Sequence, residues 1–104
     1  MTTHQRSELN MQRYVIERAI PDIGSAEREA LKGAAAQSNT VLSAMQSEGK
    51  HIQWEHSYVA GDQTYCIYVA DDPSLIAEHA ERSGFPATTV TEISKIIDPT
   101  TAAA

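Results

Sequence analysis

The sequence predicts an α+β domain in which two helices cover one face of a four-stranded antiparallel sheet. Three observations support this fold class. Strand-like and helix-like segments alternate in the order βαββαβ, a Gly-Asp pair separates the two middle strands, and the composition, with 41% hydrophobic and 21% charged residues, is that of an ordinary globular protein. A chain of 104 residues can bury a hydrophobic core without disulfides, and its single cysteine excludes an intramolecular one.

The first strand and the first helix are expected between residues 11 and 49. Residues 11–18 carry β-branched and aromatic side chains and are followed by a turn sequence at residues 20–24. Ser25 offers an N-cap hydroxyl for a helix that ends near Gly49. The buried stripe of this helix recurs at spacings of four and three residues: Leu31, Ala35, Ser38, Leu42 and Met45.

The second half repeats the pattern. Residues 51–59 and 64–70 are predicted strands, joined by a two-residue turn at Gly61-Asp62. Asp72 caps the second helix, Pro73 occupies its first position and Gly84 ends it. Residues 88–97 form the last strand. Right-handed crossovers then give the ferredoxin-like arrangement. We expect a flexible segment at residues 1–10, one domain at residues 11–98 and a flexible tail at residues 99–104.

The turn at Gly61-Asp62 sets the register of the middle strands. We expect three pairs: Tyr58 with Tyr65, His56 with Ile67, and Trp54 with Val69. The more apolar set of alternating residues is assigned to the helix side: Trp54, His56, Tyr58, Tyr65, Ile67 and Val69. The half-polar set is assigned to the open side: Glu55, Ser57, Val59, Thr64, Cys66 and Tyr68. A three-residue loop would instead place Tyr58 opposite Cys66 and His56 diagonal to it, roughly 7–8 Å away.

The first strand adds to both faces. Tyr14 and Ile16 are expected in the helix-side core, which leaves Arg13, Val15 and Glu17 on the open face near Cys66. Arg18 is expected in a surface ion pair, with the alternative that it neutralises a buried carboxylate or an anionic ligand. Because an open apolar sheet face is usually covered by a second copy, we predict a homodimer packed through sheet faces or edges.

Potential metal ligands are concentrated in the middle strands and the second helix. His56 and His79 would converge if both face the layer between sheet and helices, and two imidazoles suit nickel, copper or zinc. Cys66 is a third candidate, and Glu17 and Glu55 are weaker oxygen ligands. In the favoured register His56 and Cys66 point to opposite faces. Each residue also has a purely structural interpretation: a buried cysteine, a hydrogen-bonded core histidine or a solvated strand carboxylate.

Charge and hydropathy exclude two classes of partner. The formal net charge of −6 argues against nucleic acid, whose phosphates require a basic face. No segment approaches the roughly 20 apolar residues that span a bilayer, so no membrane partner is expected. Residues 1–10 lack the apolar run of a signal peptide, and a lone cysteine fits a reducing compartment. A cytoplasmic location is therefore predicted.

Five blocks of sequence together resemble a small bacterial family of unknown function, described as a nickel-binding protein with a ferredoxin-like fold. They are ERAIP at 17–21, WEHSY at 54–58, YCIYVA at 65–70, EHA at 78–80 and GFPA at 84–87. The resemblance spans residues 13–99 and implies a dimeric, α/β-barrel-like assembly and a nickel ion. His56, Cys66 and His79 are the nickel-compatible positions within these blocks.

The favoured function is a small metal-binding protein, for nickel or another divalent transition metal, that acts by sequestration or delivery rather than by turnover. No catalytic residue is assigned. The alternative is a small-molecule binder or enzyme of the dimeric α/β-barrel type, with a pocket on the open sheet face lined by Tyr68, Cys66, Ser57, Glu17 and Glu55. A third interpretation is an interaction module with neither metal nor cavity.

Overall fold

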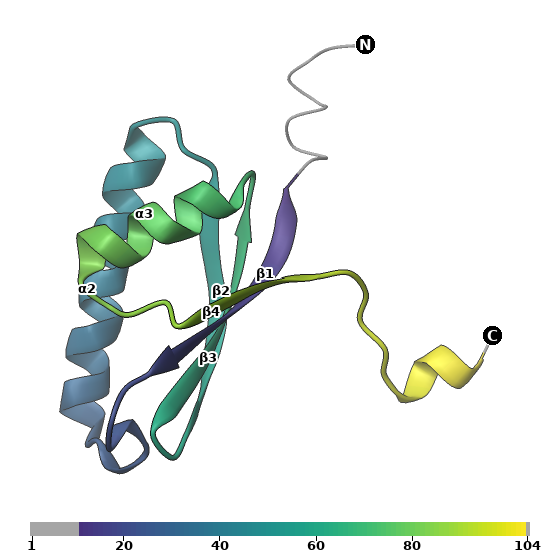
Figure 1. Cartoon of the computed structure of the whole chain (residues 1–104), viewed down its shortest axis with the longest axis horizontal. Coiled ribbons are helices and arrows are strands. Elements are labelled where there is room, and N and C mark those ends of the chain that lie inside the picture. Colours follow the sequence, from purple (N-terminus) through teal and green to yellow (C-terminus); the bar gives the residue numbers. More distant parts are fainter. Residues whose placement is uncertain (1–10, 104) are drawn as a thin grey trace.

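The computed structural model describes residues 11–103, so the segment 1–10, which was predicted to be flexible, lies outside the described residues. Four strands form one antiparallel sheet in the order β2-β3-β1-β4, and both long helices cover the same face (Figure 1). The predicted ferredoxin-like fold is confirmed. The elements are β1 Gln12–Ala19, η1 Ile23–Ser25, α2 Arg28–Ser47, β2 Ile52–Ala60, β3 Gln63–Ala70, α3 Pro73–Ser83, β4 Thr89–Ile93 and η2 Pro99–Ala103.

The two helices differ in how well their ends were predicted. Helix α3 is capped as expected, because the Asp72 side chain accepts a hydrogen bond from the Ser74 amide and Gly84 adopts a left-handed conformation with φ 82°. Helix α2 begins later than predicted, at Arg28. Ser25 belongs to the short 3₁₀ helix η1, and its hydroxyl donates to the Asp22 carbonyl oxygen at 3.0 Å instead of capping α2.

The last strand is shorter than predicted. β4 pairs with β1 only from Glu17↔Thr89 to Arg13↔Ile93. Because β1 itself begins at Gln12, the predicted continuation through residues 94–97 has almost no strand to pair with, and Ile96 and Ile97 are exposed.

The predicted hairpin turn is confirmed, and the register is confirmed for the half of the hairpin nearest the turn. Ala60 pairs with Gln63, Tyr58 with Tyr65 and His56 with Ile67. The register then shifts between Trp54 and His56, so Trp54 pairs with Tyr68 and not with Val69. Glu55 is the extra residue of this β-bulge. Because the bulge adds one residue, Trp54 lies on the opposite face from His56, the face of Tyr68.

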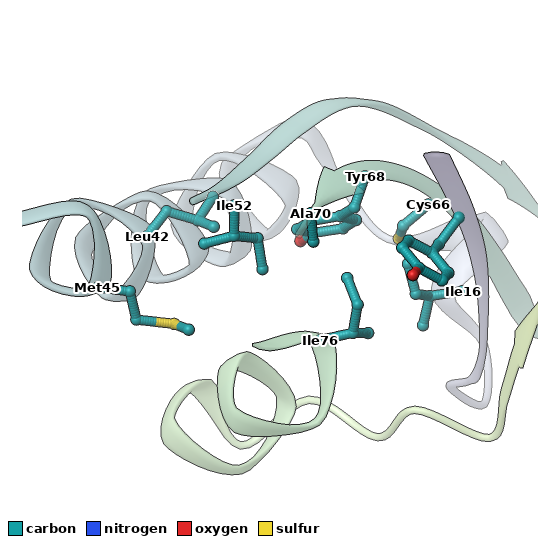
Figure 2. Packing of buried hydrophobic residues seen from close by; sticks show 9 residues of the cluster. Ile16, Leu42, Met45, Ile52, Cys66, Tyr68, Ala70 and Ile76 are labelled. Carbon is teal, nitrogen blue, oxygen red and sulfur yellow. The ribbon is translucent and has the colours of Figure 1, made fainter. Parts of the chain in front are cut away.

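The assignment of faces to β2 and β3 was reversed, except for Trp54, which lies on the helix side as predicted, and Glu55, which lies on the open face as predicted. Cys66 and Tyr68 belong to the buried core, and Figure 2 shows their side chains on the same side of the sheet as Ile76 of α3. Tyr58 and Tyr65, which were assigned to the core, are 61% and 36% exposed. The cause is the neighbouring strand: Cys66 pairs with Ile16 of β1, and paired residues share a face, so the correctly predicted burial of Ile16 places Cys66 on the helix side.

One end of the layer between the sheet and α2 is closed by backbone contacts. The Ile20 amide donates to the Asp62 carbonyl oxygen at 2.9 Å, and the Gly24 amide donates to that of Gly61 at 2.6 Å. A Cβ at Gly24 would lie 2.7 Å from the Gly61 carbonyl oxygen, so only glycine fits there without rearrangement. These contacts hold the turn that carries Ile20 and Ile23 against the hairpin.

Candidate functional site

The five predicted metal ligands divide between the two faces of the sheet. Glu17, Glu55 and His56 lie on the open face, whereas Cys66 and His79 lie between the sheet and the helices. Within residues 11–103, no three His, Cys, Asp or Glu side chains form a group that could hold a metal ion. One subunit therefore does not bring the five residues into a single site.

On the open face, the β-bulge brings two candidate ligands together. Glu55 and His56 are consecutive residues, yet both line a surface hollow of about 310 Å³. A bulge allows this because it interrupts the alternation of side chains along the strand. The ring of His56 lies edge-on to that of Tyr58, with 5.1 Å between the ring centroids. His56 is exposed to solvent.

The Glu55 carboxylate is held by an arginine from β1. Arg13 donates from Nε to Oε1 at 2.9 Å and from Nη2 to Oε2 at 2.8 Å. These hydrogen bonds, together with the charge of Arg13, hold the pKa of Glu55 below its ordinary value. Glu17 also lies on this face, where its Oε1 accepts a hydrogen bond from Gln63 Nε2 at 3.0 Å. The open face thus carries one exposed imidazole beside an ionised carboxylate.

His79 is a buried histidine and does not meet His56. Its side chain is 0% exposed, and its Nε2 lies 3.1 Å from the Ser38 hydroxyl, which in turn lies 3.3 Å from the Tyr68 hydroxyl. Burial, and secondly the charge of Arg18, lower the pKa of His79 to about 4, so the imidazole is neutral at neutral pH. The expected convergence of the two histidines is wrong, because the sheet separates them.

A cavity of about 270 Å³ lies between the sheet and α2. Its walls are largely apolar and include Trp54, Cys66 and Tyr68 from the strands and Ala34 and Ala35 from the helix. The alternative function placed a pocket with Tyr68, Cys66 and Ser57 on the open face. These three residues do line one cavity, but on the helix side, because of the reversed faces, and Glu17 and Glu55 are not part of it.

Arg18 is the one charged residue in the wall of this cavity, and it is 3% exposed. Its Nη1 donates to the Pro86 carbonyl oxygen at 2.7 Å, but its Nη2 has no hydrogen-bond partner. The rings of Tyr68 and Phe85 each lie 5.9 Å from its Cζ. No Asp or Glu within the described chain forms an ion pair with it, so the predicted surface pair is wrong. Its alternation with Tyr14 and Ile16 was the signal that indicated burial.

Comparison with known proteins identifies the family. A family model described as nickel responsive protein SCO4226-like matches residues 14–93, from β1 to the end of β4. The protein belongs to this family. No curated protein and no solved structure matched the chain. The expected resemblance to a nickel-related family is therefore confirmed, and the matched region includes both the open-face residues Glu55 and His56 and the cavity. In the part of the chain that the structure describes, no helix is long and apolar enough to cross a membrane.

Proposed function

We propose that the protein is a cytoplasmic homodimer that binds Ni²⁺ at the open face of its sheet and serves nickel sequestration or delivery rather than catalysis. The observation that carries the proposal is the β-bulge, which sets Glu55 and His56 on one exposed face. The family description, nickel responsive protein, supports the choice of metal.

The chemistry of this pair suits nickel. Imidazole nitrogen and carboxylate oxygen are both ligands for divalent first-row metals, with imidazole the better match to nickel. His56 is exposed, so an ion reaches it without any opening of the core. Since Arg13 already lowers the pKa of Glu55, an incoming metal competes with the guanidinium for this carboxylate and not with a proton.

A second copy of the chain completes the ligand set. In a two-fold symmetric dimer the same surface patch is presented by both subunits, so a contact through the open faces supplies two His56 and two Glu55 side chains. The exposed rings of Tyr58 and Tyr65 on this face favour such a contact, because their burial would remove apolar surface from water. Glu17 lies on the same face and is retained as a further oxygen ligand.

Nickel titration tests the site. Metal-free protein without an affinity tag is titrated calorimetrically with NiCl₂, and the wild type is expected to bind one ion per two chains. His56→Ala is expected to weaken binding at least about tenfold, because the loss of even an outer-shell partner of a metal ligand costs about 10–100-fold in affinity. His51→Ala is the matched control, because His51 is another exposed histidine and is paired with Asp71 at the end of the hairpin away from the turn.

The same titration of Cys66→Ala and His79→Ala tests the two buried candidates. Unchanged affinity in His56→Ala, with a loss in either buried variant, would move the metal to the helix side and reject the open-face site. Copper and zinc in place of nickel measure the preference among divalent metals.

Sedimentation velocity tests the assembly. The wild type is expected to sediment as a dimer, and Tyr58→Glu as a monomer with an unchanged circular dichroism spectrum, because a charge on the open face would oppose its burial. A monomeric wild type, both with and without nickel, would reject the dimer and with it the shared site.

A further inference from the structure

We propose that the cavity between the sheet and α2 binds a small apolar monocarboxylate, whose charge pairs with the guanidinium of Arg18. This site lies on the opposite side of the sheet from the proposed nickel ligands and does not depend on them. Three observations carry the inference: a buried cation with a free donor, walls that are otherwise largely apolar, and an opening to solvent.

The surroundings of the buried Arg18 side chain favour the binding of an anion. A buried charge is costly unless it is paired and hydrogen-bonded, and buried arginines are normally matched by a carboxylate or phosphate. Here the guanidinium donates to the Pro86 carbonyl oxygen and lies over the rings of Phe85 and Tyr68, whose hydroxyl also interacts with it. Its Nη2 is left without a hydrogen-bond partner. A carboxylate fits because its two oxygens match the fork of guanidinium donors.

The cavity walls determine the rest of the ligand. Cys66, Tyr68 and Trp54 face α2, where Ala34 and Ala35 leave space that larger side chains would fill. An engineered apolar cavity of about 150 Å³ holds benzene. By that scale, the 270 Å³ here accommodate a ligand of about ten non-hydrogen atoms.

The charge balance selects a monoanion. Arg18 is the one ionised side chain in the cavity wall, and no Asp or Glu lines it, so the cavity neutralises one negative charge. The Ser57 hydroxyl already accepts a hydrogen bond from Trp54 Nε1 at 3.0 Å. A dianionic phosphate would need several more donors than this wall provides. Val59, 43% exposed, marks the end at which the cavity reaches solvent.

The single tryptophan provides the readout. Trp54 lines the cavity and is the only tryptophan of the chain, so its fluorescence reports binding directly. Octanoate is expected to change the emission saturably and to raise the melting temperature of the protein, because a ligand that binds only the folded state stabilises it. Octanamide, with the same apolar body and no charge, is expected to bind at least about tenfold more weakly.

Two variants and a control localise the site. Arg18→Met is expected to bind octanoate at least tenfold more weakly, whereas Arg13→Met, which removes an arginine from the other face of the same strand, binds it as the wild type does. Ala35→Leu keeps Arg18 but fills the cavity, so this variant is expected to lose octanoate binding altogether.

Equal affinity for octanoate and octanamide, wild-type affinity in Arg18→Met, or wild-type affinity in Ala35→Leu would each overturn the proposal. If Arg18→Met does not fold, Ala35→Leu decides alone. The proposal is also rejected if octanoate at millimolar concentration changes neither the fluorescence nor the melting temperature of the wild type. His56→Ala is expected to bind octanoate normally, so a failure of the nickel site leaves this result unaffected.

Discussion

Arg13 and Arg18 belong to the same strand, β1, but to opposite faces of the sheet, and their surroundings differ completely. Arg13 is partly exposed and holds Glu55 through two hydrogen bonds. Arg18 is buried and has no carboxylate partner in the described chain. The histidines follow the same division, because His56 is exposed while His79 is buried.

This contrast teaches that burial, more than residue type, decides what each side chain can do. On the open face, water and paired charges leave His56 available to an ion from solution. On the helix side, burial keeps His79 neutral and leaves part of a guanidinium without a partner, which favours a ligand that carries its own negative charge.

The largest difference between the two faces is expected when an isoleucine on each face is replaced by alanine and the free energies of unfolding are compared. Ile16→Ala removes a side chain that is 0% exposed on the helix side and is expected to lower the free energy of unfolding by about 2–5 kcal/mol. Ile67→Ala on the open face, where the side chain is only partly buried, is expected to cost about 1 kcal/mol. Urea unfolding of the two variants measures both values. Equal losses would mean that the faces are equally packed.

The buried histidine makes stability depend on pH. The pKa of His79 is lowered in the folded state to about 4, against an ordinary value of 6.5, so below pH 6.5 the unfolded state binds more protons. Stability is therefore expected to fall as pH drops from 6.5 towards 4, by about 3 kcal/mol in total from this residue. Urea unfolding of metal-free wild type and of His79→Gln, between pH 7 and pH 4.5, measures this loss of stability.

The carboxylates titrate in both wild type and His79→Gln. The difference between the two proteins in the pH dependence of the free energy of unfolding therefore gives the contribution of His79 alone. An equally steep loss in His79→Gln would assign the effect to other groups.

The closed end of the cavity supplies the next test. Gly24→Ala would place its Cβ 2.7 Å from the Gly61 carbonyl oxygen and is expected to cost about 1–3 kcal/mol, because a backbone contact must move. Gly33→Ala is the matched control, since nothing lies within 4 Å of its added Cβ, and it is expected to stabilise α2 by up to about 1 kcal/mol. Thermal unfolding compares the two. A neutral Gly24→Ala would show that the turn is not held tightly against the hairpin.

The smallest effect is expected on the open face. Glu55→Gln breaks a partly exposed ion pair and is expected to lower stability by at most about 1 kcal/mol, with the loss shrinking as salt is added. Unfolding at low and at high ionic strength measures this. A larger loss that is insensitive to salt would mean that the pair with Arg13 is shielded from solvent, and that Glu55 is poorly available to a metal.

Much of the fold followed from local sequence. Asp72 and Gly84 define α3 because a cap and a left-handed glycine act within a few residues, and Gly61-Asp62 defines the hairpin for the same reason. The bulge at Glu55 gave no local signal. It moved Trp54 to the face of Tyr68, against the expectation from strict alternation.

The candidate site was predicted less well, because on β3 both alternating sets include apolar residues. Tyr65 and Ile67 looked more suited to the core than Cys66 and Tyr68, yet the latter pair is buried. The choice was made by β1, which lies beside β3 and presents Tyr14 and Ile16 to the helices. Long-range pairing thus outweighed the composition of the strand itself.

The sequence by itself determined the order of the elements, the turn that joins β2 to β3 and the family to which the chain belongs. Only the tertiary structure decided that His56 is exposed and His79 buried, and that Arg18 borders an apolar cavity without an acidic partner. The physical reason is that turns and caps are set by a few neighbouring residues, whereas burial is a collective result of strands and helices packing against one another.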